Sequence, residues 1–200
     1  MKKSLTVGCV IMASGLSRRF GANKLLADFC GQPMLCRAFA ATAAPSISAR
    51  IVVTRSEEVQ ALCRAQGVPV LLHSLPGRND TVRLGLSVLL KQLPELSGCM
   101  FLPGDQPLLR RESVGRLVDF YREHPEHIAA LGHDGVRGNP CLFPARLFPE
   151  LLALQGDHGG NQVIRRHEED LLLWEVPAPE LTDVDTPQVL AQLRRDMAEE

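Results

Sequence analysis

Short, continuously apolar segments alternate along the first half of the chain with segments in which apolar residues recur every three or four positions. Uninterrupted apolar runs are typical of strands buried on both faces, whereas the wider spacing is typical of helices packed on one side. The pattern predicts strands at residues 5–13, 50–54, 68–73 and 99–103. It predicts helices at residues 33–44, 56–66 and 80–93, the first with Pro33 in its opening turn. This alternation predicts a three-layer α/β/α fold with a mostly parallel, mixed sheet between two layers of helices.

The second half of the chain is less regular but continues to mix the two kinds of segment. Residues 128–144 contain two apolar strands around a turn at Asp134 and Gly135. The closing helix has Pro187 in its first turn and either Asp185 or Thr186 as its N-cap. The other predicted elements are helices at 112–124, 145–154, 160–169 and 186–200 and a strand at 170–177. No repeat, low-complexity segment or linker divides the chain, so residues 1–200 are expected to form a single domain.

The composition is that of an ordinary globular protein. Of the 200 residues, 45% are hydrophobic and 22% are charged, and 22 basic against 23 acidic side chains leave a net charge of −1. This balance argues against a nucleic-acid-binding surface. The six cysteines form no C-x-x-C pair and lack the short spacings of a zinc site, which favours reduced thiols in the cytoplasm.

The beginning of the chain has a superficial likeness to a secretion signal. Two lysines precede the apolar run at 5–13, but an Arg-Arg pair follows it and there is no A-x-A cleavage site. We therefore expect this run to be the first core strand. No apolar stretch reaches the roughly 18 residues needed to span a bilayer, so a soluble, cytoplasmic protein without membrane contacts is expected.

A glycine-punctuated loop carrying three cations follows the first predicted strand. Gly15 and Gly21 are not spaced as G-x-G-x-x-G, and Lys24 does not belong to the G-K-[ST] ending of a P-loop. Glycines let backbone N–H groups approach an anion closely, and Arg19 and Lys24 could offset the charge of a nucleoside triphosphate. Alternatively, these two residues and Arg18 merely solvate a surface loop. The spacing alone leaves both interpretations open.

Acidic residues follow two other predicted strands. Asp105 lies just beyond the strand at 99–103, and Asp183 and Asp185 lie in the segment L-T-D-V-D-T-P. Ligands of open α/β sheets bind outside the carboxyl ends of the strands, where a carboxylate can hold Mg²⁺ against phosphate groups. Asp105 could instead serve a local turn, and Asp185 could cap the last helix.

Together these segments resemble the molybdopterin nucleotidyltransferases, and most closely the molybdenum cofactor cytidylyltransferases. The family's opening signature, L-A-A-G-x-S-x-R-M-G-x-x-K-L-L, corresponds to M-A-S-G-L-S-R-R-F-G-A-N-K-L-L at residues 12–26. Four further family elements follow in order: G-D-x-P at 104–107, G-H-P at 138–140, G-D-x-G at 156–159 and D-x-D-T-P at 183–187. The resemblance therefore covers almost the whole chain.

The resemblance implies a Rossmann-like nucleotidyltransferase fold that binds CTP and Mg²⁺ above the sheet. It implies transfer of CMP from CTP to the phosphate of molybdopterin, with a molybdenum hydroxylase as the recipient of the product. The nucleotide contacts carried over are Ala13, Ser14, Gly15, Ser17, Arg19, Gly21, Lys24, Asn79, Thr81 and Arg83. The metal ligands carried over are Asp105 and Asp185, and the acceptor contacts are Asn139, Asp157, His158 and Gly159. The residues expected to act in catalysis are Arg19, Lys24 and Asp105.

The implied chemistry is an in-line displacement, in which an acceptor phosphate oxygen attacks the α-phosphorus of CTP and pyrophosphate leaves. Because this oxygen is already ionised near neutral pH, neither a protein nucleophile nor an essential general base is expected. Catalysis would rest on positioning and on charge stabilisation. The histidines other than His158 are therefore expected to have no role in the chemistry; they are His73, His124, His127, His133 and His167.

Two departures from the family pattern bear on the substrates. Ser14 stands at the second Ala of the signature, where guanine-using relatives tend to have Gly, so this residue favours CTP. Asn139 replaces the His of G-H-P, which leaves the acceptor open. One alternative is a nucleotidyltransferase of the same fold that uses GTP or a sugar phosphate. Another is a non-catalytic, cofactor-binding accessory protein, which would have no evident need for Lys24, Asp105 and Asp185.

Overall fold

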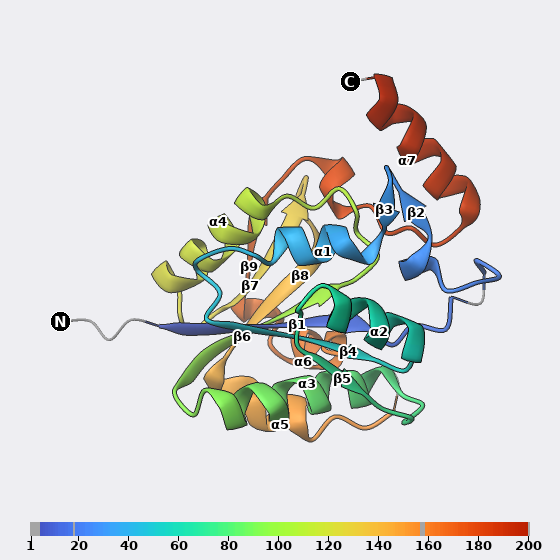
Figure 1. Ribbon diagram of the computed structural model, residues 1–200. Coiled ribbons are helices and arrows are strands. Elements are labelled where there is room, and N and C mark those ends of the chain that lie inside the picture. The colour runs from blue at the N-terminus through green and yellow to red at the C-terminus, as the bar shows by residue number, and fades with distance from the viewer. Residues whose placement is uncertain (1–4, 18, 157–158, 200) are drawn as a thin grey trace.

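A seven-stranded sheet in the order β5-β4-β1-β6-β8-β7-β9 forms the centre of the molecule (Figure 1). The structure is a computed structural model and describes residues 5–17, 19–156 and 159–199. β8 pairs antiparallel with both β6 and β7, and the other neighbouring strands pair in parallel. This confirms the expected mostly parallel, mixed sheet. The strands of the sheet are β1 (Thr6–Ala13), β4 (Ala49–Thr54), β5 (Val70–Leu72), β6 (Leu96–Pro103), β7 (Ile128–His133), β8 (Val136–Pro144) and β9 (Leu171–Glu175).

Alternate residues of β1 face two separate cores on opposite sides of the sheet. Val7, Cys9 and Ile11 are fully buried in one apolar cluster. Val10 is fully buried in the other. Since β4 and β6 flank this strand and helices cover both faces, every position between its ends is buried except Met12, which is partly buried. The continuous apolar run in the sequence follows from this double burial.

Helices cover both faces of the sheet and complete the three-layer fold. The cluster containing Val7 includes residues of α1, α2, α4 and α7, and the cluster containing Val10 includes residues of α3, α5 and α6. Figure 1 shows α1 and α4 above the sheet and α3 and α5 below it. The helices are α1 (Leu35–Ala41), α2 (Glu57–Ala65), α3 (Arg78–Gln92), α4 (Arg111–Glu123), α5 (Phe148–Leu152), α6 (Asn161–Arg166) and α7 (Pro187–Glu199). Short 3-10 helices are η1 (Lys24–Leu26), η2 (Ala145–Leu147), η3 (Glu168–Asp170) and η4 (Ala178–Leu181).

The packing of α3 on the sheet fixes which side of that helix faces the site. Val82, Leu86 and Leu89 are buried in the cluster around Val10. Between them, Gly85 approaches so closely that a Cβ atom there would lie 2.5 Å from Val10 Cγ1. Because these positions recur every three to four residues, they define one buried face and set the rotation of the whole helix.

Two turns link strands that are adjacent in the sequence. Asp134 and Gly135 have φ angles of 51° and 74°, which confirms the hairpin turn expected between β7 and β8. The expectation that Pro33 opens a helix is wrong, because Pro33 pairs with Asp28 in a small separate hairpin. Its strands are β2 (Asp28–Phe29) and β3 (Gln32–Pro33), and α1 begins two residues later.

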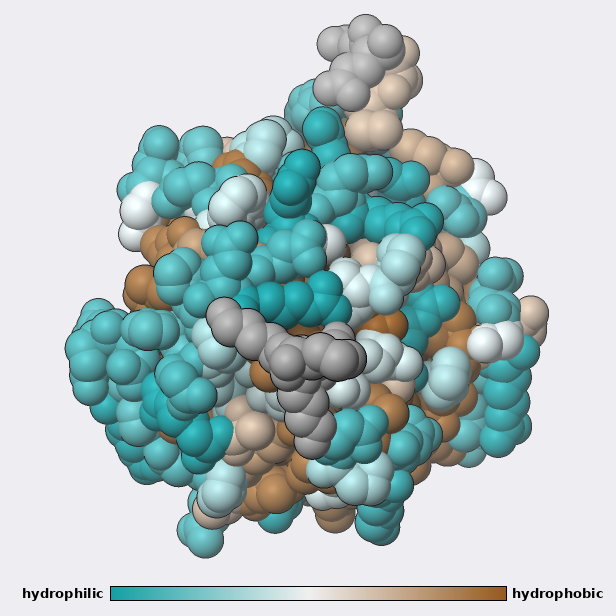
Figure 2. Space-filling model, turned by 90° about the vertical axis from the view of Figure 1, so that its left-hand side faces the viewer, coloured by the Kyte–Doolittle hydropathy of each residue, from teal (hydrophilic) through white to brown (hydrophobic). Residues whose placement is uncertain are grey.

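The face of the molecule at which β1 begins is largely hydrophilic, and its apolar residues form separate patches (Figure 2). This agrees with helices whose apolar sides point inward to the two cores. Among the described helices, none combines the length and the apolar character needed to cross a membrane.

Candidate active site

A cleft of about 640 Å³ lies at the end of the sheet where the parallel strands β1, β4 and β6 finish. This volume is typical of small-molecule sites. Loops that leave the carboxyl ends of β1, β4 and β6 line one part of the cleft, and one face of β8 lines another. Because β8 is antiparallel to its neighbours, its first residues lie at the end of the sheet where β1 and β6 finish. Of the expected site residues, those lining the cleft are Ser14, Gly15, Ser17, Arg19, Lys24, Thr81, Asp105, Asn139, Gly159 and Asp185. Arg18, Asp157 and His158 lie outside the described residues.

The loop after β1 folds back on itself so that Lys24 enters the cleft. Ser17 lies at the bend with φ at 49°, and its Oγ accepts a hydrogen bond from the Lys24 N–H at 3.2 Å. The Ser17 carbonyl also accepts from the Phe20 N–H at 2.9 Å. Gly21 follows with φ at 77°, a conformation that side-chain-bearing residues rarely adopt. Asn23 then caps η1, the short helix that begins at Lys24.

Two of the expected nucleotide contacts support the loop without lining the cleft. Ala13 ends β1, and its carbonyl accepts a hydrogen bond from the buried Thr54 Oγ1 at 3.0 Å. Gly21 supplies the positive φ described above. Their contact with a nucleotide stays a prediction.

Lys24 is the centre of a charge cluster in the cleft. Its Nζ lies 2.5 Å from Asp105 Oδ2 and 3.0 Å from Asp185 Oδ1. Arg19 lies on the outer side, with Nη2 2.7 Å from Asp185 Oδ2. Burial opposes the charge on Lys24, but the two carboxylates outweigh this effect and raise the pKa of its ammonium group. The hydrogen bond from Lys24 in turn lowers the pKa of Asp185.

Backbone contacts bring the two acidic loops together. The Val184 N–H donates to the Asp105 carbonyl at 2.9 Å, which aligns the segment before α7 with the segment after β6. Thr186, rather than Asp185, caps α7, because its Oγ1 accepts a hydrogen bond from the Val189 N–H at 3.3 Å. The side chain of Asp185 is therefore available to the charge cluster.

The carboxylates around Lys24 fit a divalent metal ion. One oxygen each from Asp105 and Asp185 converges on a single ammonium group, so the same two oxygens can converge on a metal cation. Carboxylate oxygens are the ligands that Mg²⁺ prefers. Asp183 also lines the cleft, where desolvation and then the nearby Asp105 carboxylate raise its pKa to about 6. A bound cation would relieve this crowding of negative charge.

Val53, His73 and Arg55, to which the sequence analysis gave no role in the site, hold Ser14 in place. Ser14 Oγ donates to the Val53 carbonyl at 3.1 Å and lies 2.9 Å from His73 Nε2. Since its proton goes to Val53, Ser14 accepts from His73, which assigns the Nε2–H tautomer to that ring. Burial and then Arg55 lower the pKa of His73, consistent with a neutral ring. Arg55 also binds the Ser14 carbonyl through Nε at 3.0 Å and Nη2 at 2.7 Å, and the Pro76 carbonyl through Nη1 at 3.0 Å.

The first turns of α3 present Thr81 to the cleft but turn Asn79 and Arg83 away from it. Thr81 is 2% exposed, and its Oγ1 has no hydrogen-bond partner among the described residues. Asn79 Oδ1 instead accepts from the Gly159 N–H at 2.6 Å, and Arg83 pairs with Asp80. Asn79 and Arg83 line a second pocket. They are not among the residues that line the cleft, because residues four apart share a helix face and the packing of α3 points that face to the second pocket. Their contact with a nucleotide stays a prediction.

One face of β8 lines the half of the cleft expected to receive the acceptor. The residues that face it alternate along the strand, as the two-residue period requires, and are Arg137, Asn139, Cys141 and Phe143. Asn139 was expected there, whereas Arg137 was not singled out by any sequence motif. Arg137 Nη2 donates to Asn161 Oδ1 at 3.0 Å, and Nη1 donates to Cys141 Sγ at 3.4 Å.

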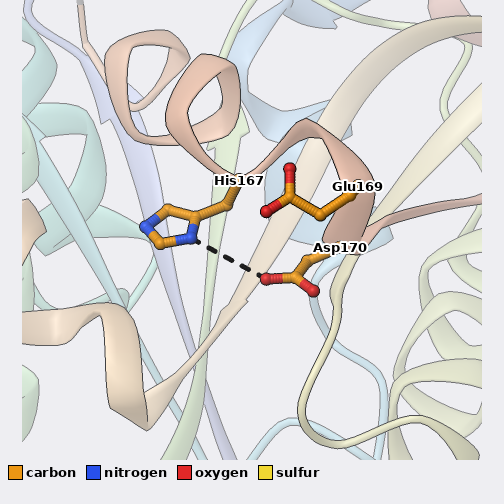
Figure 3. Close-up of side chains that lie close together, drawn as sticks. All are labelled: His167, Glu169 and Asp170. Atoms are coloured by element: carbon orange, nitrogen blue, oxygen red, sulfur yellow. Dashed lines mark ion pairs between the residues drawn. The ribbon is translucent and has the colours of Figure 1, made fainter.

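A second group of charged side chains lies outside the cleft. His167 Nδ1 is 3.7 Å from Asp170 Oδ2, and Glu169 is close to both (Figure 3). Each offers one ligand atom, and these atoms lie within 4.8 Å of one another, as ligands of a metal ion would. However, Arg146 is already 2.6 Å from Asp170 Oδ2, and His167 Nε2 is 2.7 Å from Glu150 Oε1. The group is therefore an ion-pair network between α5 and the segment before β9.

Several curated proteins show sequence similarity to this chain, and two of them represent the range of the matches. The 3-deoxy-manno-octulosonate cytidylyltransferase of Neisseria gonorrhoeae is 34% identical over 113 residues, which cover 56% of this chain and 44% of that enzyme. The chain thus matches less than half the length of this relative. Purine catabolism protein PucB of Bacillus subtilis is 25% identical over 215 residues, which cover 99% of this chain and 100% of that protein.

Solved structures share the fold. Rv0371c from Mycobacterium tuberculosis has a TM-score of 0.82 at 22% identity, covering 96% of this chain and 98% of that one. CMP:2-keto-3-deoxy-manno-octonic acid synthetase, solved with CTP, has a TM-score of 0.76 at 18% identity, covering 97% and 99% of the two chains. These similarities confirm the Rossmann-like nucleotidyltransferase fold.

One family model spans most of the chain. The model described as the MobA-like NTP transferase domain matches residues 9–171. This range includes the loop after β1, Asp105 and the whole of β8. The chain therefore belongs to the MobA-like NTP transferase domain family.

Proposed function

We propose that this protein is a metal-dependent cytidylyltransferase that transfers CMP from CTP to the phosphate of molybdopterin and releases pyrophosphate. The product would be the cytosine dinucleotide cofactor of molybdenum hydroxylases. The observation that carries the proposal is the convergence of Asp105 and Asp185 on Lys24, 2.5 and 3.0 Å from its Nζ, beside the loop after β1. A protein that only carried a cofactor would have no need for a cation and two acids at one point of the cleft.

In this reaction the triphosphate lies along the loop after β1, where Arg19 and Lys24 offset its negative charge. Asp105 and Asp185 would hold Mg²⁺, which supplies further charge neutralisation on the phosphates. An oxygen of the acceptor phosphate attacks the α-phosphorus, the bond to the bridging oxygen of the β-phosphate breaks, and pyrophosphate leaves with that electron pair. The chain supplies position and charge, and no bond to a protein side chain forms.

The choice of CTP over GTP rests on Ser14. Its side chain lines the cleft, and Val53 and His73 hold its hydroxyl group. A purine needs more room than a pyrimidine, and a fixed side chain at this position takes up space that a glycine would leave open. The Neisseria relative is named a cytidylyltransferase, and the synthetase of similar fold was solved with CTP, so both also favour CTP.

A second candidate is a cytidylyltransferase that uses a sugar acid as its acceptor. The specific observation in its favour is the 34% identity to the 3-deoxy-manno-octulosonate cytidylyltransferase of Neisseria. The motifs at 138–140 and 156–159 favour molybdopterin instead, through their resemblance to the molybdenum cofactor enzymes.

One assay separates these candidates. The protein is incubated with Mg²⁺, one nucleoside triphosphate and either molybdopterin or 3-deoxy-manno-octulosonate, and pyrophosphate is measured. We expect release with CTP and molybdopterin only. Release with GTP would overturn the choice of nucleotide, release with the sugar acid would favour the second candidate, and release with no combination would favour a carrier.

The variant Asp105→Ala tests the assignment of the metal ligand. We expect its pyrophosphate release to fall by about 100-fold or more, because the charge of the leaving group loses a main source of stabilisation. Asp119→Ala is the matched control, since Asp119 is an exposed carboxylate on α4 that pairs with Arg122. Full activity of Asp105→Ala would show that the assignment is wrong.

A further inference from the structure

Arg137 is a cation in the cleft whose hydrogen-bond partners are both neutral. Its guanidinium donates to the Asn161 amide oxygen at 3.0 Å and to the Cys141 sulfur at 3.4 Å. Within the described part of the chain, no carboxylate forms an ion pair with it. A guanidinium has five N–H donors, so Arg137 keeps both its charge and donors for a further partner.

Other cations of the cleft have partners that reduce what they can offer. Lys24 is shared by two carboxylates, and Arg19 pairs with one of them. Arg55 is directed at two backbone carbonyls, those of Ser14 and Pro76. Unlike Lys24 and Arg19, Arg137 has no ion-pair partner among the described acids, so its attraction on an anion is offset less than theirs.

The topology separates Arg137 from the loop that would hold the triphosphate. In the sheet, β6 lies between β1 and β8, so Asp105, which follows β6, lies between the loop after β1 and the beginning of β8. Arg137 is the second residue of β8 and faces the cleft from that side. An anion bound there approaches the metal-binding acids from the side opposite to the nucleotide loop.

We propose that Arg137 is the residue that binds the phosphate group of the acceptor, with Asn161 as the positioning residue that holds its guanidinium. The planar guanidinium matches two phosphate oxygens, and a phosphate ester held in this way would keep its third terminal oxygen for attack. The identity of the acceptor as a phosphate ester rests on the proposed function, whereas binding of an oxyanion rests on the contacts of Arg137 alone.

Three variants separate charge, shape and positioning at this site. Arg137→Gln removes the charge, and Arg137→Lys keeps the charge but loses the planar fork. Asn161→Asp leaves Arg137 in place but gives it an acidic partner, so the attraction for an anion should be cancelled. Arg116→Gln is the control, because it removes one positive charge from an exposed position of α4 outside the cleft.

The primary measurement is titration of each variant with inorganic phosphate in the presence of Mg²⁺ and the α,β-methylene analogue of CTP. The analogue cannot be cleaved at the reacting bond, and it occupies the triphosphate part of the cleft. We expect Arg137→Gln and Asn161→Asp to raise the phosphate dissociation constant by about 10-fold to 100-fold, and Arg137→Lys by less. We expect Arg116→Gln to leave it unchanged, and all variants to bind the analogue like the wild type.

The same variants are then compared in the pyrophosphate assay with molybdopterin. Arg137→Gln should raise the KM for the acceptor and leave the KM for CTP unchanged. If Arg137→Gln binds phosphate as tightly as the wild type, the inference is wrong. It is also wrong if Arg137→Gln binds the CTP analogue more weakly but phosphate normally. Tighter binding of acetate than of phosphate to the wild type would assign the site to a carboxylate and also overturn it. If phosphate binding follows the prediction while no pyrophosphate is released, the proposed function fails and the anion site stands.

Discussion

Lys24 illustrates how one residue connects the packing of the site to its chemistry. Its side chain is only 12% exposed, and a buried ammonium group is stable because Asp105 and Asp185 lie within 3.0 Å. The two acids come from parts of the chain 80 residues apart, and each would repel the other without a cation between them. The same two carboxylates that stabilise the lysine are the ones proposed to hold the metal ion.

Asp183 provides a test of this crowding of acids. Its pKa is raised from 3.8 to about 6, so between these values the folded protein keeps a proton that the unfolded chain has lost. The free energy of unfolding should therefore fall as the pH rises through this interval and level off above about pH 6. Asp183→Asn cannot ionise, so its stability relative to the wild type should increase over the same interval.

The measurement is urea unfolding of both proteins, without metal, at pH values from about 4 to 7. Asp119→Asn, on the exposed side of α4, is the control and should show no such trend. A difference between Asp183→Asn and the wild type that stays constant with pH would contradict the raised pKa.

The sequence motifs identified Lys24, Asp105 and Asp185, because each lies in a segment with a recognisable pattern. Arg137 and His73 belong to none of the recognised motifs, and only strand pairing and loop contacts bring them to the site. Sequence patterns thus predict residues that act within one local segment better than residues that act through distant contacts.

At the scale of elements, apolar spacing predicted the order and type of the main strands and helices but not their rotation. Asn79 and Arg83 were expected at the nucleotide, but the burial of Val82 and Leu86 directs them to the second pocket, so their contact with a nucleotide stays a prediction. The small hairpin at residues 28–33 was also missed, because strands of two residues are too short to show a period. Its turn residues, Cys30 and Gly31, both have positive φ, which only the tertiary structure reveals.

Two glycine substitutions test the contact between α3 and β1. In Gly85→Ala the new Cβ would lie 2.5 Å from Val10 Cγ1, so the helix must shift, at a cost of about 1–3 kcal/mol in the free energy of unfolding. Gly115→Ala is the matched control, because Gly115 is also within a helix and a Cβ there meets nothing within 4 Å. It should stabilise the protein by about 0.5–1 kcal/mol through helix propensity. Denaturant unfolding measures both, and equal effects would contradict the close packing of α3.

At the scale of the whole molecule, the cleft joins segments from both halves of the chain. The loop after β1, the segment after β6 and the segment before α7 meet at Lys24. The hydrogen bond from the Gly159 N–H to Asn79 joins the segment before α6 to α3. A ligand that occupies the cleft would touch all of these segments at once. Its binding free energy therefore adds to the stability of the complete fold.

Thermal unfolding tests this coupling together with the metal requirement. With CTP at about 100 times its dissociation constant, binding adds about 2.7 kcal/mol, which should raise the Tm by about 5–10 °C in the presence of Mg²⁺. The increase should be much smaller with EDTA, because Asp105 and Asp185 then repel the triphosphate. Lys24→Ala should lose most of the increase even with Mg²⁺. An increase that is equal with and without Mg²⁺ would contradict a metal-supported nucleotide site.

The antiparallel direction of β8 has a consequence for how a protein with this fold can acquire new acceptor substrates. The half of the cleft proposed to hold the nucleotide is assembled mainly from segments that follow separate strands of the central sheet. The other half comes from one uninterrupted stretch, residues 137–164, that enters the cleft along β8 and returns to it at the start of α6. A lineage can therefore replace or remodel that single stretch and acquire a new acceptor while its means of holding a nucleotide is inherited intact.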